Sequence, residues 1–177
     1  MMPLVTGTWC ARHNDMLPDY EIVPRRGIGI ILFGITREEL VDILGEPDET
    51  ELPDESSGVR LESCLYNSIN CSFSFDPDHD GKLVEISVEN GYFHVFNLIR
   101  VGVSKEDLLA IETKIKLGKA FIKDEGSEEF PTHELISYDH LGLNLHFDDG
   151  IISKIQIRVL FNTDDSVNWP EENNEES

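Results

Sequence analysis

The chain has 177 residues, with 14 Lys and Arg against 35 Asp and Glu, which gives a formal net charge of −21. A field of that sign repels nucleic acid and anionic membranes and attracts basic protein surfaces, so we expect neither nucleic acid nor membrane as a partner. Hydrophobic residues make up 40% of the chain, enough for a packed core, and no apolar run reaches the roughly 18 residues of a membrane span.

Cysteine usage and the N-terminal residues predict a cytoplasmic protein. Three cysteines are an odd number without metal-binding spacing, which is typical of free thiols in a reducing compartment. Residues 1–15 contain neither the basic segment nor the sustained apolar segment of a signal peptide.

Residues 1–26 are interpreted as an N-terminal extension without clear periodicity. Within it, Tyr20, Ile22 and Val23 can form a short edge strand. A first repeat is then expected over 27–90, opening with the apolar run 27–33. Thr36 and Glu39 form the sequence pattern of a capping box, and Gly45 is typical of a helix end. A short helix is therefore predicted between Thr36 and Gly45.

A strand pattern occurs twice, at 66–76 (YNSINCSFSFD) and at 138–148 (YDHLGLNLHFD). The two segments match at a constant offset of 72. Apolar side chains at every second position indicate strands with one buried face: Cys71, Phe73 and Phe75 in the first segment, Leu143, Leu145 and Phe147 in the second.

A second repeat is expected over 91–161. Ser104 is the predicted N-cap of its helix, Leu108, Ile111 and Ile115 form the apolar stripe, and Gly118 is the predicted end. Alternating residues predict the last strand of each repeat at 83–88 and 151–161. Residues 162–177 hold six acids and no base, which predicts a disordered acidic tail unless Trp169 docks on the core.

The expected fold class is α+β. We predict a tandem duplication of a helix plus an antiparallel β-hairpin or meander unit, with the helices packed on one face of antiparallel sheet. The pattern leaves open whether the two repeats share one continuous sheet or abut as a pair.

The start of each repeat, Gly34-Ile35-Thr36-Arg37-Glu38 and Gly102-Val103-Ser104-Lys105-Glu106, and the Leu44-Gly45-Glu46-Pro47 element carry a resemblance. They resemble the repeat of beta-lactamase-inhibitor-protein-like folds and the helix–LGxP–hairpin pattern of small outer-membrane assembly lipoproteins. The likeness covers 27–161, although the second repeat has Leu117-Gly118-Lys119-Ala120 in place of LGxP. Tandem copies look like bacterial proteins that include immunity proteins. The resemblance implies partner binding through a sheet face and carries no catalytic residues across.

No catalytic, cofactor or metal motif is recognised, so the chain is expected not to be an enzyme. Asp76-Pro77-Asp78-His79-Asp80-Gly81 begins like a calcium loop, but Ser87 stands where the bidentate Glu is required, which favours a turn. The six histidines show no zinc spacing, and His146 is expected to face solvent. Acid/base pairs are too numerous for any one to be singled out.

Two acidic segments are the candidate partner-binding sites. Residues 46–55 contain six acids and 124–129 four, without a base in either. The predicted interaction protein is an inhibitor or immunity protein that masks a basic partner such as a nuclease toxin. The alternatives are a structural or assembly adaptor and, less favoured, a small-ligand-binding domain. The residues expected to contact the partner are Asp48, Glu49, Glu51, Asp54, Asp124, Glu125, Glu128 and Glu129.

Overall fold

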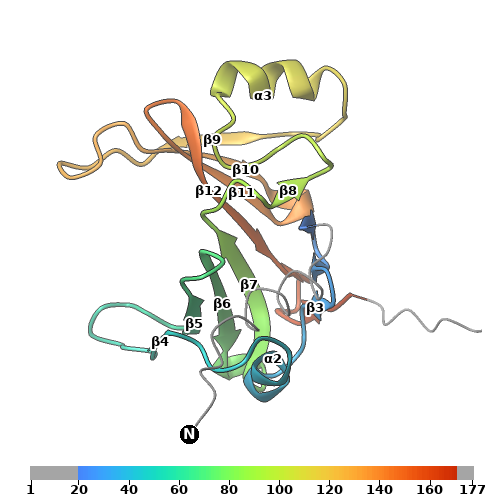
Figure 1. Ribbon diagram of the computed structural model, residues 1–177, viewed down its shortest axis with the longest axis vertical. Helices are drawn as coiled ribbons and strands as arrows, with labels where there is room; N and C mark the ends of the chain where they lie inside the picture. Colours follow the sequence, from blue (N-terminus) through green and yellow to red (C-terminus); the bar gives the residue numbers. More distant parts are fainter. Residues whose placement is uncertain (1–19, 171–177) are drawn as a thin grey trace, which may run out of the picture.

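The computed structural model describes residues 20–170, and its main element is an antiparallel sheet of eight strands in the order β4-β5-β6-β7-β12-β11-β10-β9 (Figure 1). Strands β7 and β12 pair at its centre, with Ile86 opposite Ile157. The sheet is therefore continuous between the two halves of the chain. Its strands are β4 (Glu49–Glu51), β5 (Glu62–Tyr66), β6 (Cys71–Asp76), β7 (Lys82–Val88), β9 (Phe121–Asp124), β10 (Glu134–Tyr138), β11 (Leu143–Asp148) and β12 (Ile151–Arg158).

A smaller sheet has the order β3-β2-β1-β8 and joins four short strands. They are β1 (Glu21–Val23), β2 (Gly27–Ile28), β3 (Ile31–Leu32) and β8 (His94–Val95). Strand β1 was expected at an edge, but it pairs with β2 on one side and with β8 on the other. It is therefore an internal strand, and Ile22 in its centre is buried. The remaining strands, β13 (Leu160–Phe161) and β14 (Val167–Asn168), pair with each other.

Helix α2 (Arg37–Leu44) begins and ends where its local signals place it. The Thr36 hydroxyl accepts a hydrogen bond from the Glu39 backbone N–H at 3.3 Å, and the Glu39 carboxylate accepts one from the Thr36 N–H at 2.8 Å. Both halves of the capping box are thus formed. Gly45 ends the helix at φ 85°, in the left-handed region that favours glycine.

Helix α3 (Lys105–Glu112) has the predicted N-cap at Ser104 but ends well before Gly118. The Thr113 hydroxyl donates a hydrogen bond to the Ala110 carbonyl at 2.7 Å, and Lys114 N–H turns back to Ile111. A side chain that bonds the preceding turn competes with continued helix. Beyond this point the chain is no longer α-helical, although Leu117 within it is buried.

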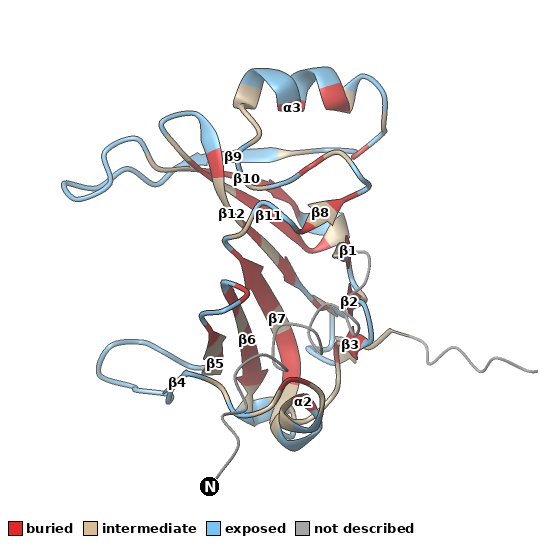
Figure 2. Ribbon diagram, viewed as in Figure 1, coloured by how far each residue is buried: buried red, intermediate tan, exposed pale blue. Residues whose placement is uncertain are grey.

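The hydrophobic core lies on one face of the large sheet and extends to the small sheet and both helices. Buried residues concentrate along the middle strands in Figure 2. The prediction that Phe73, Phe75, Leu145 and Phe147 are buried is confirmed, with at most 1% of each exposed. Each half has a tyrosine that ties a strand to a helix end: Tyr66 donates to the Gly45 carbonyl at 2.8 Å, and Tyr138 donates to Glu112.

The predicted α+β class, with a duplicated helix-plus-hairpin unit and helices on one face of the sheet, is wrong. Residues 20–170 are mostly β, with 41% of them in strands and 15% helical. The two α-helices found within residues 20–170 have eight residues each. They are too short to form a layer, because one such helix covers only about 12 Å. The long antiparallel sheet dominates instead.

Two turns and the chain end complete the fold. The predicted turn at Asp76–Gly81 forms between β6 and β7, with a 3-10 turn over Pro77–His79 and positive φ at Asp80 and Gly81, 59° and 63°. Asp149 and Gly150 form a two-residue turn between β11 and β12, and both have positive φ, 50° and 75°, as a type I′ hairpin requires. The side chain of Trp169 is half-buried, lies against Gly34 and takes the Lys82 ammonium over its ring at 5.3 Å. The tail was predicted to be disordered unless Trp169 docks on the core, and Trp169 does pack against it. Residues 171–177 of the tail and residues 1–19 of the N-terminal extension lie outside the described part.

Candidate functional site

Alternation along the strands gives the large sheet a second face, which we call the polar face. In β6, Cys71, Phe73 and Phe75 point into the core, so Ser72 and Ser74 lie on the opposite side. Polar side chains predominate on that side, although Leu65, Leu135 and Phe121 also lie there. Ser74, Ser87, Ser137 and Asn144 are nevertheless buried by their neighbours on this face. Contact with another molecule is therefore available mainly at the exposed edge strands β4 and β9.

The strand registers align one residue per strand into a row across the whole polar face. Ser87 of β7 lies opposite Gln156 of β12 at the centre. From there the pairing continues outward to an edge strand on either side. In order, the row is Glu49, Leu65, Ser72, Ser87, Gln156, Asn144, Ser137 and Phe121.

The side chains of this row are held by hydrogen bonds between neighbouring strands. Ser137 donates to the Asn144 side-chain oxygen at 2.7 Å, and the Asn144 amide donates to Gln156 at 2.9 Å. One step along the strands, the Ser63 and Ser74 hydroxyls lie 2.9 Å apart. Such cross-strand bonds fix the rotamers of these groups. The polar face therefore presents a preorganised set of hydroxyls and amides.

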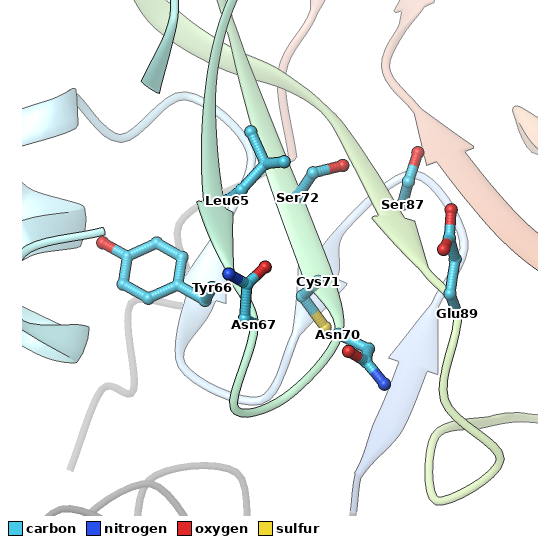
Figure 3. Close-up of a pocket in the computed structure, with 8 residues that line it drawn as sticks. All are labelled: Leu65, Tyr66, Asn67, Asn70, Cys71, Ser72, Ser87 and Glu89. Atoms are coloured by element: carbon cyan, nitrogen blue, oxygen red, sulfur yellow. The ribbon is translucent and has the colours of Figure 1, made fainter. Parts of the chain in front are cut away.

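A small hollow lies where the row crosses β5, β6 and β7. Figure 3 shows Leu65, Ser72 and Ser87 on three neighbouring strands, with Glu89 just beyond the end of β7. The hollow has a volume of about 130 Å³. That volume suits a few water molecules or one inserted side chain rather than a metabolite.

A charged pair lies beside the row. Glu85 of β7 is directly opposite Arg158 of β12. Burial raises the pKa of the Glu85 carboxyl, although hydrogen bonding to Gln156 and the charges of Arg158 and Lys154 oppose that shift. Glu85 and Arg158 border a wider hollow of about 550 Å³, which is also lined by His79. A hydrogen bond with Asp76 raises the pKa of the His79 ring.

The first acidic segment lies at one edge of the sheet. Glu49 and Glu51 belong to edge strand β4 and pair with Leu65 and Ser63, so both lie on the polar-face side. The Asp48 carboxylate accepts a hydrogen bond from the Asn67 N–H at 2.7 Å. Asp54 accepts from the N–H and hydroxyl of Ser56 and holds a local turn. Glu49 and Glu51 are thus the residues of this segment that are exposed and directed along the polar face.

The second acidic segment lies at the opposite edge, beside β9, and the two are not equivalent. Asp124 pairs with Glu134 in the register that belongs to the core side, whereas Phe121 and Lys123 take the polar-face positions. Glu125 turns toward His133, with its carboxylate oxygen 3.9 Å from the ring nitrogen. Glu128 and Glu129 are exposed in the loop. The structure therefore brings the eight predicted contact residues to two separate edges, not to one cluster.

A histidine pair beside this second edge was not predicted. His133 precedes β10 and His146 lies in β11, and their facing ring nitrogens, Nε2 and Nδ1, are 3.3 Å apart. Burial chiefly lowers the pKa of His146, and its ring is only partly accessible rather than facing solvent. With Glu125 they form a group of three potential ligand atoms that lie within 4.8 Å of one another.

The sequence contained the signal for this pair, but only through the hairpin register. Tyr138 pairs with Leu143, which places His133 opposite Asp148 and diagonal to His146. Searching for helical i, i+4 spacing does not detect neighbours of this kind, because they meet across strands.

The sequence matches no protein-family model and no curated protein. Solved structures with a partial likeness include an extracellular protein containing a SCP domain from Bacillus anthracis (16% identity, TM-score 0.43), covering 70% of this chain and 42% of that one. A DUF4309 family protein from Bacillus subtilis has 17% identity and a TM-score of 0.43, covering 70% and 77%. A cysteine-rich secretory protein from Staphylococcus aureus has 15% identity and a TM-score of 0.45, covering 78% and 48%. The chain thus spans less than half of the first and third, and likeness at these TM-scores carries no argument about function.

Proposed function

We propose that this chain is a non-enzymatic protein-binding module that holds a basic protein against its polar face, as an inhibitor or immunity protein does. The observation that carries the proposal is the placement of exposed acids along the sheet edges, with Glu49 and Glu51 directed along the polar face. A net charge of −21 strengthens attraction to a basic surface. A nuclease toxin is the partner class favoured, because its nucleic-acid cleft is positive.

The polar face suits protein binding better than catalysis. Its hydroxyls and amides are already paired with one another, and the acids at its edges are exposed. Charges at the rim of an interface mainly steer association and select partners. A cytoplasmic location is part of the same proposal and is supported by Cys64 and Cys71, which are buried free thiols. Within residues 20–170, no helix has the length and apolar character needed to cross a membrane.

The adaptor alternative is favoured by a different observation. Edge strand β9 exposes Phe121 and Ile122, at 43% and 63%. An open edge strand with apolar side chains can accept a strand from another chain. Such a partner would be bound by backbone pairing at β9 and would not require a basic surface.

The test is affinity capture from the source organism with comparative mass spectrometry. The double variant Glu49→Gln/Glu51→Gln removes the polar-face acids, and Asp42→Asn/Glu106→Gln removes two exposed helix acids as a control with the same change in net charge. We expect a basic protein captured by the parent and the control but depleted with the β4 variant. With the isolated partner, the β4 variant should slow association more than it speeds dissociation. Equal capture by all three proteins, or capture of acidic proteins only, contradicts the proposal.

A further inference from the structure

The side chains of Glu125, His133 and His146 converge in a hollow of about 410 Å³ beside the β9 edge of the sheet. Glu125 and His133 are the first and last residues of the loop between β9 and β10, and His146 lies in β11. The hollow is also lined by Glu89, Asp148 and Lys154. Three carboxylates against one ammonium give it a net negative charge, which favours a divalent cation.

The two imidazoles stand at the separation that a shared metal ion requires. Nε2 of His133 lies 3.3 Å from Nδ1 of His146. Two nitrogens on one tetrahedral zinc ion, each about 2.0–2.1 Å from it, lie about 3.3–3.4 Å apart. The Glu125 carboxylate oxygen is 3.9 Å from the same nitrogen of His133, and this exposed side chain can close the remaining few tenths of an ångström by rotating.

The outer nitrogen of His133 is held in the manner of a metal ligand. Its Nδ1 lies 2.9 Å from the Asp148 carboxylate. A carboxylate in that position keeps the proton on Nδ1 and leaves the Nε2 lone pair directed at the hollow. Asp148 is fixed by the same hairpin register that places it opposite His133.

The His146 ring is poorly explained by protein contacts alone. Its Nε2 is buried and makes no well-formed hydrogen bond among residues 20–170, although interaction with the Gln156 side chain raises the pKa of the ring against the larger effect of burial. Its Nδ1 faces Nε2 of His133, which is a lone-pair acceptor because Asp148 holds the His133 hydrogen on Nδ1. If His146 carries its own hydrogen on Nε2, two acceptors face each other. If it carries that hydrogen on Nδ1, it donates to His133. A cation between the rings accepts both lone pairs instead, and His146 then carries its hydrogen on Nε2.

We propose that Glu125, His133 and His146 form a zinc-type metal site, with Asp148 as the carboxylate that orients His133. The fourth tetrahedral position is open to the hollow and accepts a water molecule or a side chain of a bound protein. Because Glu125 belongs to the loop after β9, a bound ion fastens the second acidic segment to the sheet. The site is independent of the proposed binding function and stands if no basic partner exists.

The test is calorimetric titration of the chelator-treated full chain with zinc chloride. We expect saturation at one ion per chain, and zinc should raise the melting temperature of the parent by mass action. His133→Gln and His146→Gln should each abolish both effects, and Asp148→Asn should weaken binding by about 10–100-fold. His79→Gln is the matched control: His79 also pairs with an aspartate, Asp76 at 2.7 Å, but lies outside the group, so binding should be unchanged.

A measurement on the parent protein makes the test independent of variant folding. Imidazole nitrogen resonances in NMR spectra should shift on zinc addition for His133 at Nε2 and His146 at Nδ1, and not for His79. Absence of saturable binding below about 1 mM zinc, binding that persists in both His133→Gln and His146→Gln, or shifts confined to other histidines would each overturn the site.

Discussion

Glu85 shows how the polar face constrains a single residue. It lies half-buried on β7, between Ser74 of β6 and Arg158 of β12. Burial disfavours its charged form more than the nearby cations favour it, so its pKa is raised. The folded state therefore binds a proton at this carboxyl more tightly than the unfolded chain does. At neutral pH, keeping Glu85 ionised costs stability.

We predict that Glu85→Gln stabilises the protein at pH 7. The gain should shrink as pH falls toward the ordinary carboxyl pKa of about 4.3. The sign follows from proton linkage: a folded-state pKa above the unfolded value gives stability that is present at low pH and is lost as pH rises through that window. Each unit of raised pKa corresponds to about 1.4 kcal/mol. Thermal melts of both proteins between pH 4 and 8 measure the difference.

The exposed carboxylate of Asp42 on α2 supplies the control for this prediction, through Asp42→Asn. If Glu85→Gln melts below the parent at pH 7, the attraction of the nearby Arg158 and Lys154 charges outweighs the cost of burial. The direction given for Glu85 would then be wrong.

At the same scale, sequence reasoning identified the core residues but not the histidine group. The burial of Phe73 and Phe147 is predictable because they alternate with polar neighbours along the sequence, which is a local signal. His133 and His146 are neighbours only because of the pairing of β10 with β11. That register depends on where the hairpin turns, and one residue of slip would place the two rings on opposite faces.

Among the elements, those whose ends are marked by capping or turn residues in the sequence were predicted best. Thr36 and Ser104 begin their helices as expected, and the expected turn forms at Asp76–Gly81. Edge strand β4 falls inside the predicted acidic segment 46–55, and β9 was not predicted, because ETE and FIKD have no apolar alternation. Their strand conformation comes from pairing with β5 and β10. The class was wrong because the two helices have only eight residues each while strand pairing extends across both halves of the chain. The β7–β12 pairing that unites the sheet is not visible in either strand alone.

The capping box of α2 yields a stability prediction. Thr36→Ala removes the oxygen that accepts from Glu39 N–H and should cost about 0.5–2 kcal/mol, the usual range for losing such a cap. An eight-residue helix has little cooperativity of its own to absorb the loss. Urea unfolding measures the change. Thr36→Ser keeps the hydroxyl and should cost less; equal losses in the two variants would show that the methyl group, not the cap, matters.

At the scale of the whole molecule, the fold distributes the charged side chains unevenly over the surface. The core face carries the apolar residues of both halves as one cluster, so the charged side chains of residues 20–170 lie on the other surfaces. Six acids fall within residues 46–55 around β4 alone. Compact folding brings these carboxylates closer together than they are in the unfolded chain, and their mutual repulsion opposes the folded state.

The last prediction is that salt stabilises the parent protein and that part of the effect originates at the β4 edge. Raising sodium chloride from about 0.01 M to 0.15 M shortens the Debye length from about 30 Å to about 8 Å. The melting temperature should therefore rise. Glu49→Gln/Glu51→Gln should melt no lower than the parent at low salt and should respond less to added salt. Asp42→Asn/Glu106→Gln removes the same charge from two separated helices and should reproduce less of this change, because those acids are further from the crowded segment. A melting temperature that is unaffected by salt would mean that the acids of 46–55 are fully solvated and do not oppose folding.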